Sequence, residues 1–389
     1  MSDQPPEEDL TAGIFASNLY RASRPAKKVF LPWHLPRKHF VRVKQWQLQI
    51  EKLLDEAPPE DKTLRYLGLP GDDLLDLRFF HQTICAPRRL TLRFLGFNQG
   101  AAPRDDAQTE ADLSLDEVKK LSGIDPASNV VWDDICKIYK TDSVAFERAQ
   151  DLGPYDVVNL DLCDGFGKHA PGAHDATHYN AVARLLAMQA RRQRAWLLLL
   201  TTRAGRQHIH ADMVDRVKNK YASNLTGCAD FREESNDRFS ISDAHSLNEA
   251  IATSGGLLTV YLVGLCKWLL GLAITQNPPT DVEVKSVIGY TVESGAGSLD
   301  LVSLAIRFQP LTTTTDDPMG LANLGGQAVH ECQLATAALK RLDKRVDADL
   351  VLAEDAALAG KLTAAMADLL TLARYDPDAY LHWVADRAS

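Results

Sequence analysis

The sequence has few cysteines, and no two of them lie close together. The 389 residues contain no CxxC motif. The six cysteines are Cys85, Cys136, Cys163, Cys228, Cys266 and Cys332. This spacing argues against a secreted disulfide framework and against a zinc ribbon, and it predicts reduced thiols in a cytoplasmic protein. The first ten residues, MSDQPPEEDL, also lack the basic and apolar regions of a signal peptide.

An excess of positive charge is also lacking. The chain has 43 basic and 52 acidic residues and a formal net charge of −9. This balance argues against a protein coated with nucleic acid, but it permits a local basic site. One apolar run, residues 255–275, is long enough to cross a membrane but contains Lys267. A central lysine costs about 2.5–3.5 kcal/mol in a bilayer, so we expect a buried helix in a soluble protein that contacts no membrane.

Short apolar segments without polar alternation recur between segments with helical spacing. The expected strands are residues 64–69, 90–97, 129–132, 156–162 and 196–200. Such strands predict an α/β fold with a mostly parallel sheet covered on both faces. Two longer strands, residues 282–292 and 300–308, are joined by a Gly-containing linker, which predicts an antiparallel hairpin at the C-terminal end of the sheet.

The chain divides into three expected parts. Residues 1–60 form an N-terminal arm and helix, residues 61–310 form the α/β domain with a helical insertion at 206–275, and residues 311–389 form a helical tail. The tail offers helices through which a protein partner could bind.

Five strands alternating with helices, followed by a hairpin, is the element order of class I S-adenosylmethionine-dependent methyltransferases. Residues 61–310 resemble that superfamily. The resemblance implies a Rossmann-like methyltransferase sheet with helical N- and C-terminal additions, and S-adenosylmethionine as cofactor. Fold alone does not fix function, so each loop is considered separately.

The loop after the first strand reads LGLPGDDLL. The resemblance implies that Gly68 and Gly71 admit the cofactor and that Asp72 lies near its methionine ammonium, although the acid-x-Gly-x-Gly pattern of the family is absent. An ordinary turn, in which Asp72 or Asp73 caps the following helix, is the alternative.

The next two loops carry weaker signals. After the second strand the family places an acid that binds both ribose hydroxyls, whereas this chain has Asn98. After the third strand Asp134 is placed to meet the adenine amino group. Asn98 as a turn residue and Asp134 as a helix cap are equally open interpretations.

The loop after the fourth strand begins in NLDLCDGFG, which partly resembles the Asp-Leu-Asp-Pro-Phe-Gly segment of tRNA guanine-N2 methyltransferases. Asn159 and Asp161 share one face of the strand. The resemblance implies that Asn159, Asp161 and Asp164 face the methyl acceptor at the carboxyl end of a central strand. A structural role for Asp161 in the sheet is the alternative.

The segment PWHLPRKHFVRVKQW combines cations with aromatic residues. Arg37, Lys38 and Arg42 are candidates for nucleic-acid or phosphate contacts, since cations beside aromatics suit phosphate binding and base stacking. The alternative is a helix whose aromatics cover the sheet. The scattered histidines predict no metal site.

Two functions follow. One is a methyltransferase that acts on a nucleic acid or another large substrate. The other is a catalytically inactive methyltransferase-like scaffold or sensor in a larger bacterial assembly, which the missing glycine pattern and ribose acid favour.

Overall fold

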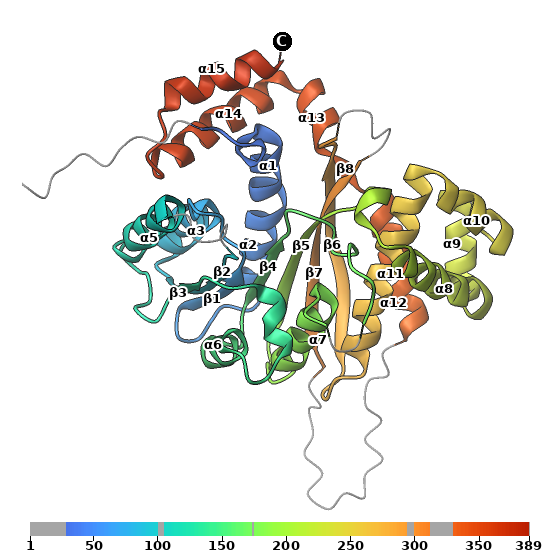
Figure 1. The fold of residues 1–389 in the computed structure, drawn as a ribbon. Helices are drawn as coiled ribbons and strands as arrows, with labels where there is room; N and C mark the ends of the chain where they lie inside the picture. The colour runs from blue at the N-terminus through green and yellow to red at the C-terminus, as the bar shows by residue number, and fades with distance from the viewer. Residues whose placement is uncertain (1–28, 100–104, 173–174, 294–298, 312–329, 389) are drawn as a thin grey trace, which may run out of the picture.

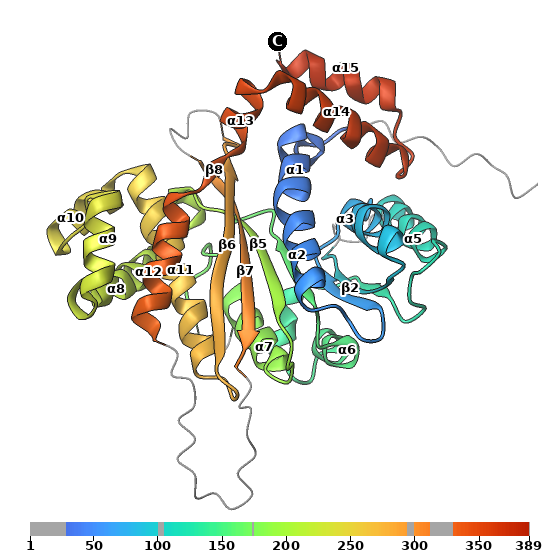
Figure 2. The same ribbon diagram turned by 180° about the vertical axis from the view of Figure 1, so that it is seen from behind.

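The computed structural model describes residues 29–99, 105–172, 175–293, 299–311 and 330–388. Eight strands form one mixed sheet flanked by helices (Figures 1 and 2). The strands are β1 (Thr63–Gly68), β2 (Thr91–Phe97), β3 (Asn129–Val131), β4 (Val157–Asp161), β5 (Trp196–Arg203), β6 (Thr280–Tyr290), β7 (Leu301–Pro310) and β8 (Val346–Asp347). The seven strands expected from the sequence are therefore confirmed, with bounds shifted by a few residues.

The strand order across the sheet is β3-β2-β1-β4-β5-β7-β6-β8. Strands β1 to β5 are parallel to one another, while β7 runs antiparallel to both β5 and β6. The predicted parallel sheet and its antiparallel hairpin are both confirmed. The short strand β8 was not predicted, and it adds to the edge of the sheet parallel to β6.

The N-terminal helix crosses one face of the sheet. It consists of α1 (Pro36–Val41), the π-helical turn η2 (Arg42–Gln47) and α2 (Leu48–Glu56), after the short turn η1 (Pro32–His34). Val41, Trp46 and Ile50 are fully buried in the core on this face. The same core includes residues of α3 (Leu75–Phe80), α5 (Asp105–Lys119), α14 (Ala356–Thr371) and α15 (Pro377–Ala388).

The opposite face of the sheet carries the second core. It is covered by α6 (Val144–Leu152), α7 (His178–Gln189), α8 (Ala211–Gly227), α9 (Ala229–Phe239), α11 (Ser254–Ile274) and α12 (Glu331–Asp343). The remaining helical elements are η3 (His81–Cys85), α4 (Ala86–Arg88), η4 (Ile135–Tyr139), η5 (Arg206–His208), α10 (Ala244–Ala252) and α13 (Ala348–Glu354). The nonalternating strands β4 and β5 are buried because both of their faces meet helices.

The long apolar run forms α11, as predicted. Among the described residues it is the one helix long and apolar enough to cross a membrane, and 78% of its most apolar window is buried inside the protein. Lys267 is itself buried, and its ammonium contacts Glu331 at 3.0 Å and the side-chain oxygen of Asn224. Burial lowers the pKa of Lys267, while Glu331 opposes this effect. These two partners are how the protein core accommodates a lysine within an apolar helix.

The cysteine expectation needs one correction. Cys228 and Cys332, which are 104 residues apart in the sequence, form a disulfide that joins the start of α9 to α12. Packing of the two helices brings the thiols together, and sequence spacing carries no information about it. The other four cysteines are free.

Candidate functional site

The strand order reverses between β1 and β4. Strand β1 has β2 on one side and β4 on the other, so the connections leaving β1 and β4 diverge at the carboxyl edge of the sheet. Gly68 lies opposite Asn159 in the register, so both connections begin side by side. Open parallel sheets bind ligands in the crevice that forms at such a reversal. The candidate site is therefore this edge, where the sequence also predicts it.

The turn after β1 has one crowded glycine and one open glycine. A Cβ atom on Gly68 would lie 2.4 Å from the hydroxyl of Tyr66, so a side chain there requires the buried ring of Tyr66 to move. A Cβ on Gly71 would have nothing within 4 Å. The backbone at Gly71 is thus open to a ligand, whereas Gly68 mainly accommodates the tyrosine.

Neither aspartate of this turn caps the next helix, which corrects that expectation. Helix α3 begins at Leu75, and its N-cap is Leu74 in a left-handed conformation (φ 50°) without a side-chain cap. Asp73 instead accepts a hydrogen bond from the hydroxyl of Tyr375 at 2.9 Å, with His34 Nε2 at 3.9 Å. Asp73 precedes the N-cap by one residue, so it does not cap the helix, and its carboxylate contacts the C-terminal segment instead.

Asp72 and Asn98, both predicted to contact the cofactor, contact each other. The Asn98 side-chain amide donates to Asp72 Oδ1 over 2.9 Å, and this pair is exposed. The Asn98 backbone N–H donates to the Val131 carbonyl at 3.1 Å, so the ends of β2 and β3 are also adjacent. The structure thus brings the first and second predicted loops together.

Asp134 forms the helix cap that the sequence left open as its alternative. Its carboxylate accepts a hydrogen bond from the Cys136 N–H at 2.8 Å and so caps η4. The neighbouring Asp133 pairs with Lys137 at 2.7 Å. Capping uses one oxygen of Asp134, and a role toward adenine stays a prediction.

Asp161 is paired with the N-terminal helix. Its carboxylate accepts a hydrogen bond from Lys38 Nζ at 2.5 Å. The Lys38 side chain is 4% exposed, and its ammonium also lies 4.5 Å from the ring centroid of Trp46. Asp161, with 20% of its side chain exposed, thus remains partly open to the carboxyl edge while it neutralises a buried cation.

Asn159 lies fully buried beneath this pair. Its amide group donates to the Tyr66 hydroxyl at 3.1 Å, and its carbonyl oxygen has no hydrogen-bond partner among the described residues. Burial raises the pKa of Tyr66 well above its ordinary value. Asn159 therefore supports β1 from within the sheet rather than facing solvent, and it leaves one acceptor unsatisfied beside the switch point.

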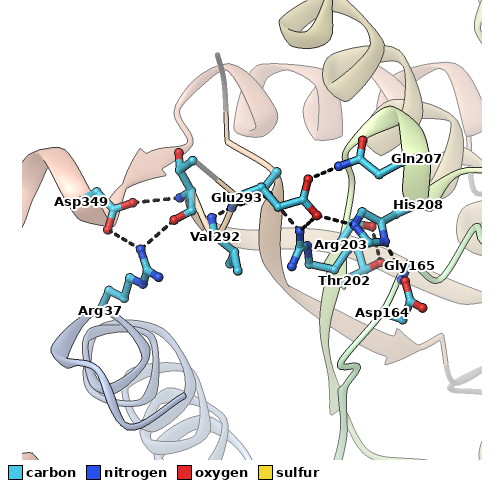
Figure 3. Close-up of polar contacts among 12 residues, drawn as sticks. Arg37, Asp164, Gly165, Thr202, Arg203, Gln207, His208, Val292, Glu293 and Asp349 are labelled. Carbon is cyan, nitrogen blue, oxygen red and sulfur yellow. Dashed lines mark hydrogen bonds and ion pairs between the residues drawn. The ribbon is translucent and has the colours of Figure 1, made fainter. Parts of the chain in front are cut away.

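A second polar cluster lies along the same edge, at β5 and β6 (Figure 3). His208 stands between two carboxylates: Nδ1 lies 2.7 Å from Asp164 Oδ1, and Nε2 lies 3.0 Å from Glu293 Oε1. Asp164 also pairs with Lys168, and Glu293 with Arg203 and Gln207. We call Asp164, His208 and Glu293 the histidine cluster.

Both acids of the histidine cluster are held in their ionised form. Burial alone would raise the pKa of Asp164, but hydrogen bonds from Lys168, the Gly165 N–H and His208 outweigh it and keep that pKa well below its ordinary value. The hydrogen bond from His208 is the main cause that lowers the pKa of Glu293. The cluster is therefore a charged, partly exposed group at the end of β5.

The cluster is anchored by backbone contacts. The Phe166 N–H donates to the Thr202 hydroxyl at 2.7 Å, which fixes the chain just after Asp164. Asp300 accepts from the Glu293 N–H at 2.9 Å and from Arg203 at 3.0 Å. The first contact ties the connection after β4 to β5, and the other two tie β5 and Glu293 to Asp300, the residue before β7.

The basic N-terminal segment lies mostly inside the protein. Lys38 and Arg42 are each 3% exposed, and Arg42 Nε binds Asp76 at 2.7 Å. Arg37 donates to the Thr291 carbonyl at 2.6 Å and lies 3.5 Å from Asp349 (Figure 3). The helix covers the sheet, as the alternative interpretation predicts, and its cations pair with acids at the carboxyl edge. Contact with nucleic acid stays a prediction, carried in this segment by Arg37 and the exposed Trp33.

Three residues of this edge are not among those that the sequence predicts: Tyr66, His208 and Glu293. Lys38 is a predicted nucleic-acid or phosphate contact, but its ammonium pairs with Asp161. His208 and Glu293 are 85 residues apart, so local sequence gives no sign that they pair. Pairs so distant in sequence are visible only after the strand order is known. Within the described residues, no group of three or more His, Cys, Asp or Glu side chains is arranged to hold a metal ion.

Comparison with known families shows the family to which the chain belongs. A family model described as PP_RS20740-like matches residues 27–385. The protein belongs to the PP_RS20740-like family. The match spans the N-terminal helix, the whole sheet and the C-terminal helices, so these parts occur together as one family unit. No curated protein matches the chain.

Proposed function

We propose that the protein is an S-adenosylmethionine-dependent methyltransferase whose cofactor lies across the carboxyl ends of β1, β2 and β4. The observation that carries the proposal is the strand order β3-β2-β1-β4-β5 followed by the antiparallel β7 and β6. The first five strands follow the order of dinucleotide-binding sheets. The antiparallel hairpin is what the resemblance to class I methyltransferases implies.

The residues at this edge fit such a cofactor in part. The open backbone at Gly71 admits close approach, and the exposed Asp72–Asn98 pair occupies the place where the resemblance puts the ammonium and ribose contacts. Asn98 is an amide and forms weaker bonds to hydroxyls than a carboxylate does. When bound, S-adenosylmethionine supplies an electrophilic methyl group. Asp161 and Asp164, at the end of β4, are the side chains proposed to face its acceptor.

The proposed acceptor is a nucleic acid or another large substrate. Trp33 and Arg37 support this choice, since an exposed aromatic ring in η1 and a partly exposed guanidinium in α1 lie close in sequence to Lys38, which pairs with Asp161. Stacking on an aromatic ring and pairing with phosphate are the general means of binding single-stranded nucleic acid.

Calorimetric titration with S-adenosylmethionine and S-adenosylhomocysteine tests the proposal. We expect both to bind, and Asp72→Ala to weaken binding by about tenfold because it removes a charged contact. Asp151→Ala is the matched control, since Asp151 is also exposed but precedes β4 at the amino edge. If neither ligand binds to the unmodified chain, the cofactor proposal fails. If both variants bind equally well, Asp72 is not a cofactor contact.

A catalytically inactive scaffold or sensor is the second candidate. It is favoured by the internal partners of the acids: Asp161 pairs with Lys38, and Asp73 with Tyr375. These contacts join the N- and C-terminal helices to the edge where a cofactor would enter. Absence of cofactor binding, together with recovery of the chain in a complex with other proteins, would support this alternative.

A further inference from the structure

A groove outside the carboxyl edge has the composition of a ligand site. It has a volume of about 650 Å³ and lies between α7, α8, α11 and the connection after β4. That volume suits a small organic molecule. Helices α8 and α11 approach closely beside it because Gly264 has no side chain: a Cβ there would lie 2.4 Å from the Cβ of Val217.

Aromatic rings form one side of the groove. The rings of Tyr179 and Trp268 are 6.2 Å apart and nearly perpendicular, and both contact the buried ring of Phe166. The hydroxyl of Tyr179 donates to the His169 carbonyl at 3.1 Å, which fixes its ring. The groove thus offers a rigid apolar corner that a flat ring can fill without ordering new side chains.

Two cations form the other side. Arg216 and Lys220 are exposed residues one turn apart on α8, so their side chains share a face of the helix. Neither forms an ion pair with a carboxylate in the part of the chain that the structure describes, and no described aspartate or glutamate lines the groove. In a chain with net charge −9, two unpaired cations beside an aromatic corner are complementary to an anion.

We propose that this groove binds a small aromatic phosphate monoester, with the phosphate between Arg216 and Lys220 and the ring against Trp268 and Tyr179. A phosphate monoester carries nearly two negative charges at pH 7 and therefore matches two cations better than a carboxylate does. The site shares no residue with the proposed cofactor site, and the proposal does not depend on cofactor binding.

Titration calorimetry with phenyl phosphate tests the site. We expect phenyl phosphate to bind the full chain, and phenol and inorganic phosphate each to bind at least about tenfold more weakly, because each lacks one of the two contacts. The double variant Arg216→Ala/Lys220→Ala should also bind phenyl phosphate at least about tenfold more weakly. Both side chains are exposed, so its melting temperature should match that of the unmodified protein.

Arg232→Ala is the matched control, because Arg232 is an exposed cation on α9 that does not line the groove. It should bind phenyl phosphate normally. Absence of binding at millimolar phenyl phosphate, equally tight binding of inorganic phosphate, or unchanged binding by the double variant would each overturn the proposal. The double variant should bind S-adenosylmethionine as the unmodified chain does, so failure of either proposal is recognised separately.

Discussion

Two groups of charges lie at the same edge of the sheet and differ in their exposure to water. Between the N-terminal helix and the sheet, Arg42 and Asp76 have side chains that are only 3% and 8% exposed. In the histidine cluster, His208 and Asp164 are 18% and 37% exposed. Their contact distances are equal, at 2.7 Å. The contact distance therefore says little about what each pair contributes to stability, because the cost of removing its charges from water differs between the two pairs.

This difference separates the structural charges from those that remain accessible. The buried pairs hold α1 and η2 against α3 and β4, and they leave little charge for a ligand. The histidine cluster keeps its charges partly in water, where a ligand can reach them. This distinction is tested by variants of ion pairs that have the same contact distance but differ in burial.

The largest effect is expected from Arg42→Met. The substitution leaves the buried Asp76 carboxylate without its cation, and loss of one partner of a buried pair costs about 3–5 kcal/mol of unfolding free energy. Arg88→Met is the matched control: Arg88 binds Asp55 at the same 2.7 Å, but their side chains are 34% and 63% exposed. Its cost should be under about 1 kcal/mol. Urea denaturation measures both, and equal losses would show that burial does not distinguish the two pairs.

The next effect is a loss of stability in mild acid, caused by His39. Burial, with a contribution from Arg42, lowers the pKa of His39 from 6.5 to about 3. The unfolded chain binds a proton at His39 below pH 6.5 and the folded chain does not, so stability decreases as pH falls from 6.5 toward 3. The slope from this residue is at most about 1.4 kcal/mol per pH unit.

His39→Gln should flatten that part of the profile. Urea denaturation at several pH values between 7 and 4 measures the difference. His382→Gln, at an exposed position, is the control and should leave the slope unchanged. A profile of the His39 variant parallel to that of the unmodified protein would show that the ring does not stay neutral in the fold.

The strands were predictable because burial on both faces leaves a direct trace in sequence. In β5, residues Trp196–Arg203 are all buried, which removes polar alternation. The hairpin was predictable from the Gly-containing linker between two long strands. Strand β8 was not, since two residues, Val346–Asp347, are too short to show a pattern.

The candidate site was predictable in position but less so in detail. Ligand sites at the carboxyl ends of parallel strands follow from topology alone, and the polar residues of β4 marked one. The partners of those residues were hidden, because Lys38 is 123 positions away from Asp161 and Glu293 is 85 away from His208. Whether an acid is paired depends on three-dimensional contacts between elements that local sequence does not encode.

A smaller loss is expected from Asp161→Asn. The amide retains the shape but leaves the buried Lys38 without a counter-charge, so unfolding free energy should fall by about 1–3 kcal/mol. Lys38→Gln/Asp161→Asn should recover much of that loss, since two neutral amides can hydrogen-bond without desolvated charge. Calorimetry with S-adenosylmethionine on the double variant then tests whether Asp161 also contributes to cofactor binding. A folded double variant with unchanged affinity would show that this acid does not contribute to it.

The smallest effect is expected from Asp164→Asn in the histidine cluster. Its partners are partly exposed, so the loss of unfolding free energy at pH 7 should be under about 1 kcal/mol. Because the folded pKa of Asp164 lies below its ordinary value of 3.8, its contribution is present above about pH 4 and is lost as pH falls further. The histidine cluster and the N-terminal helix thus differ in the pH range over which they affect stability. From pH 7 to 5, the unfolding free energy of Asp164→Asn should lie below that of the unmodified protein by a small and constant amount. In the same range the destabilising effect of His39 already develops. Urea denaturation over that range measures the offset. A loss at Asp164 as large as that at Arg42 would mean that the histidine cluster holds the fold together, and that partial exposure does not mark the charges available to a ligand.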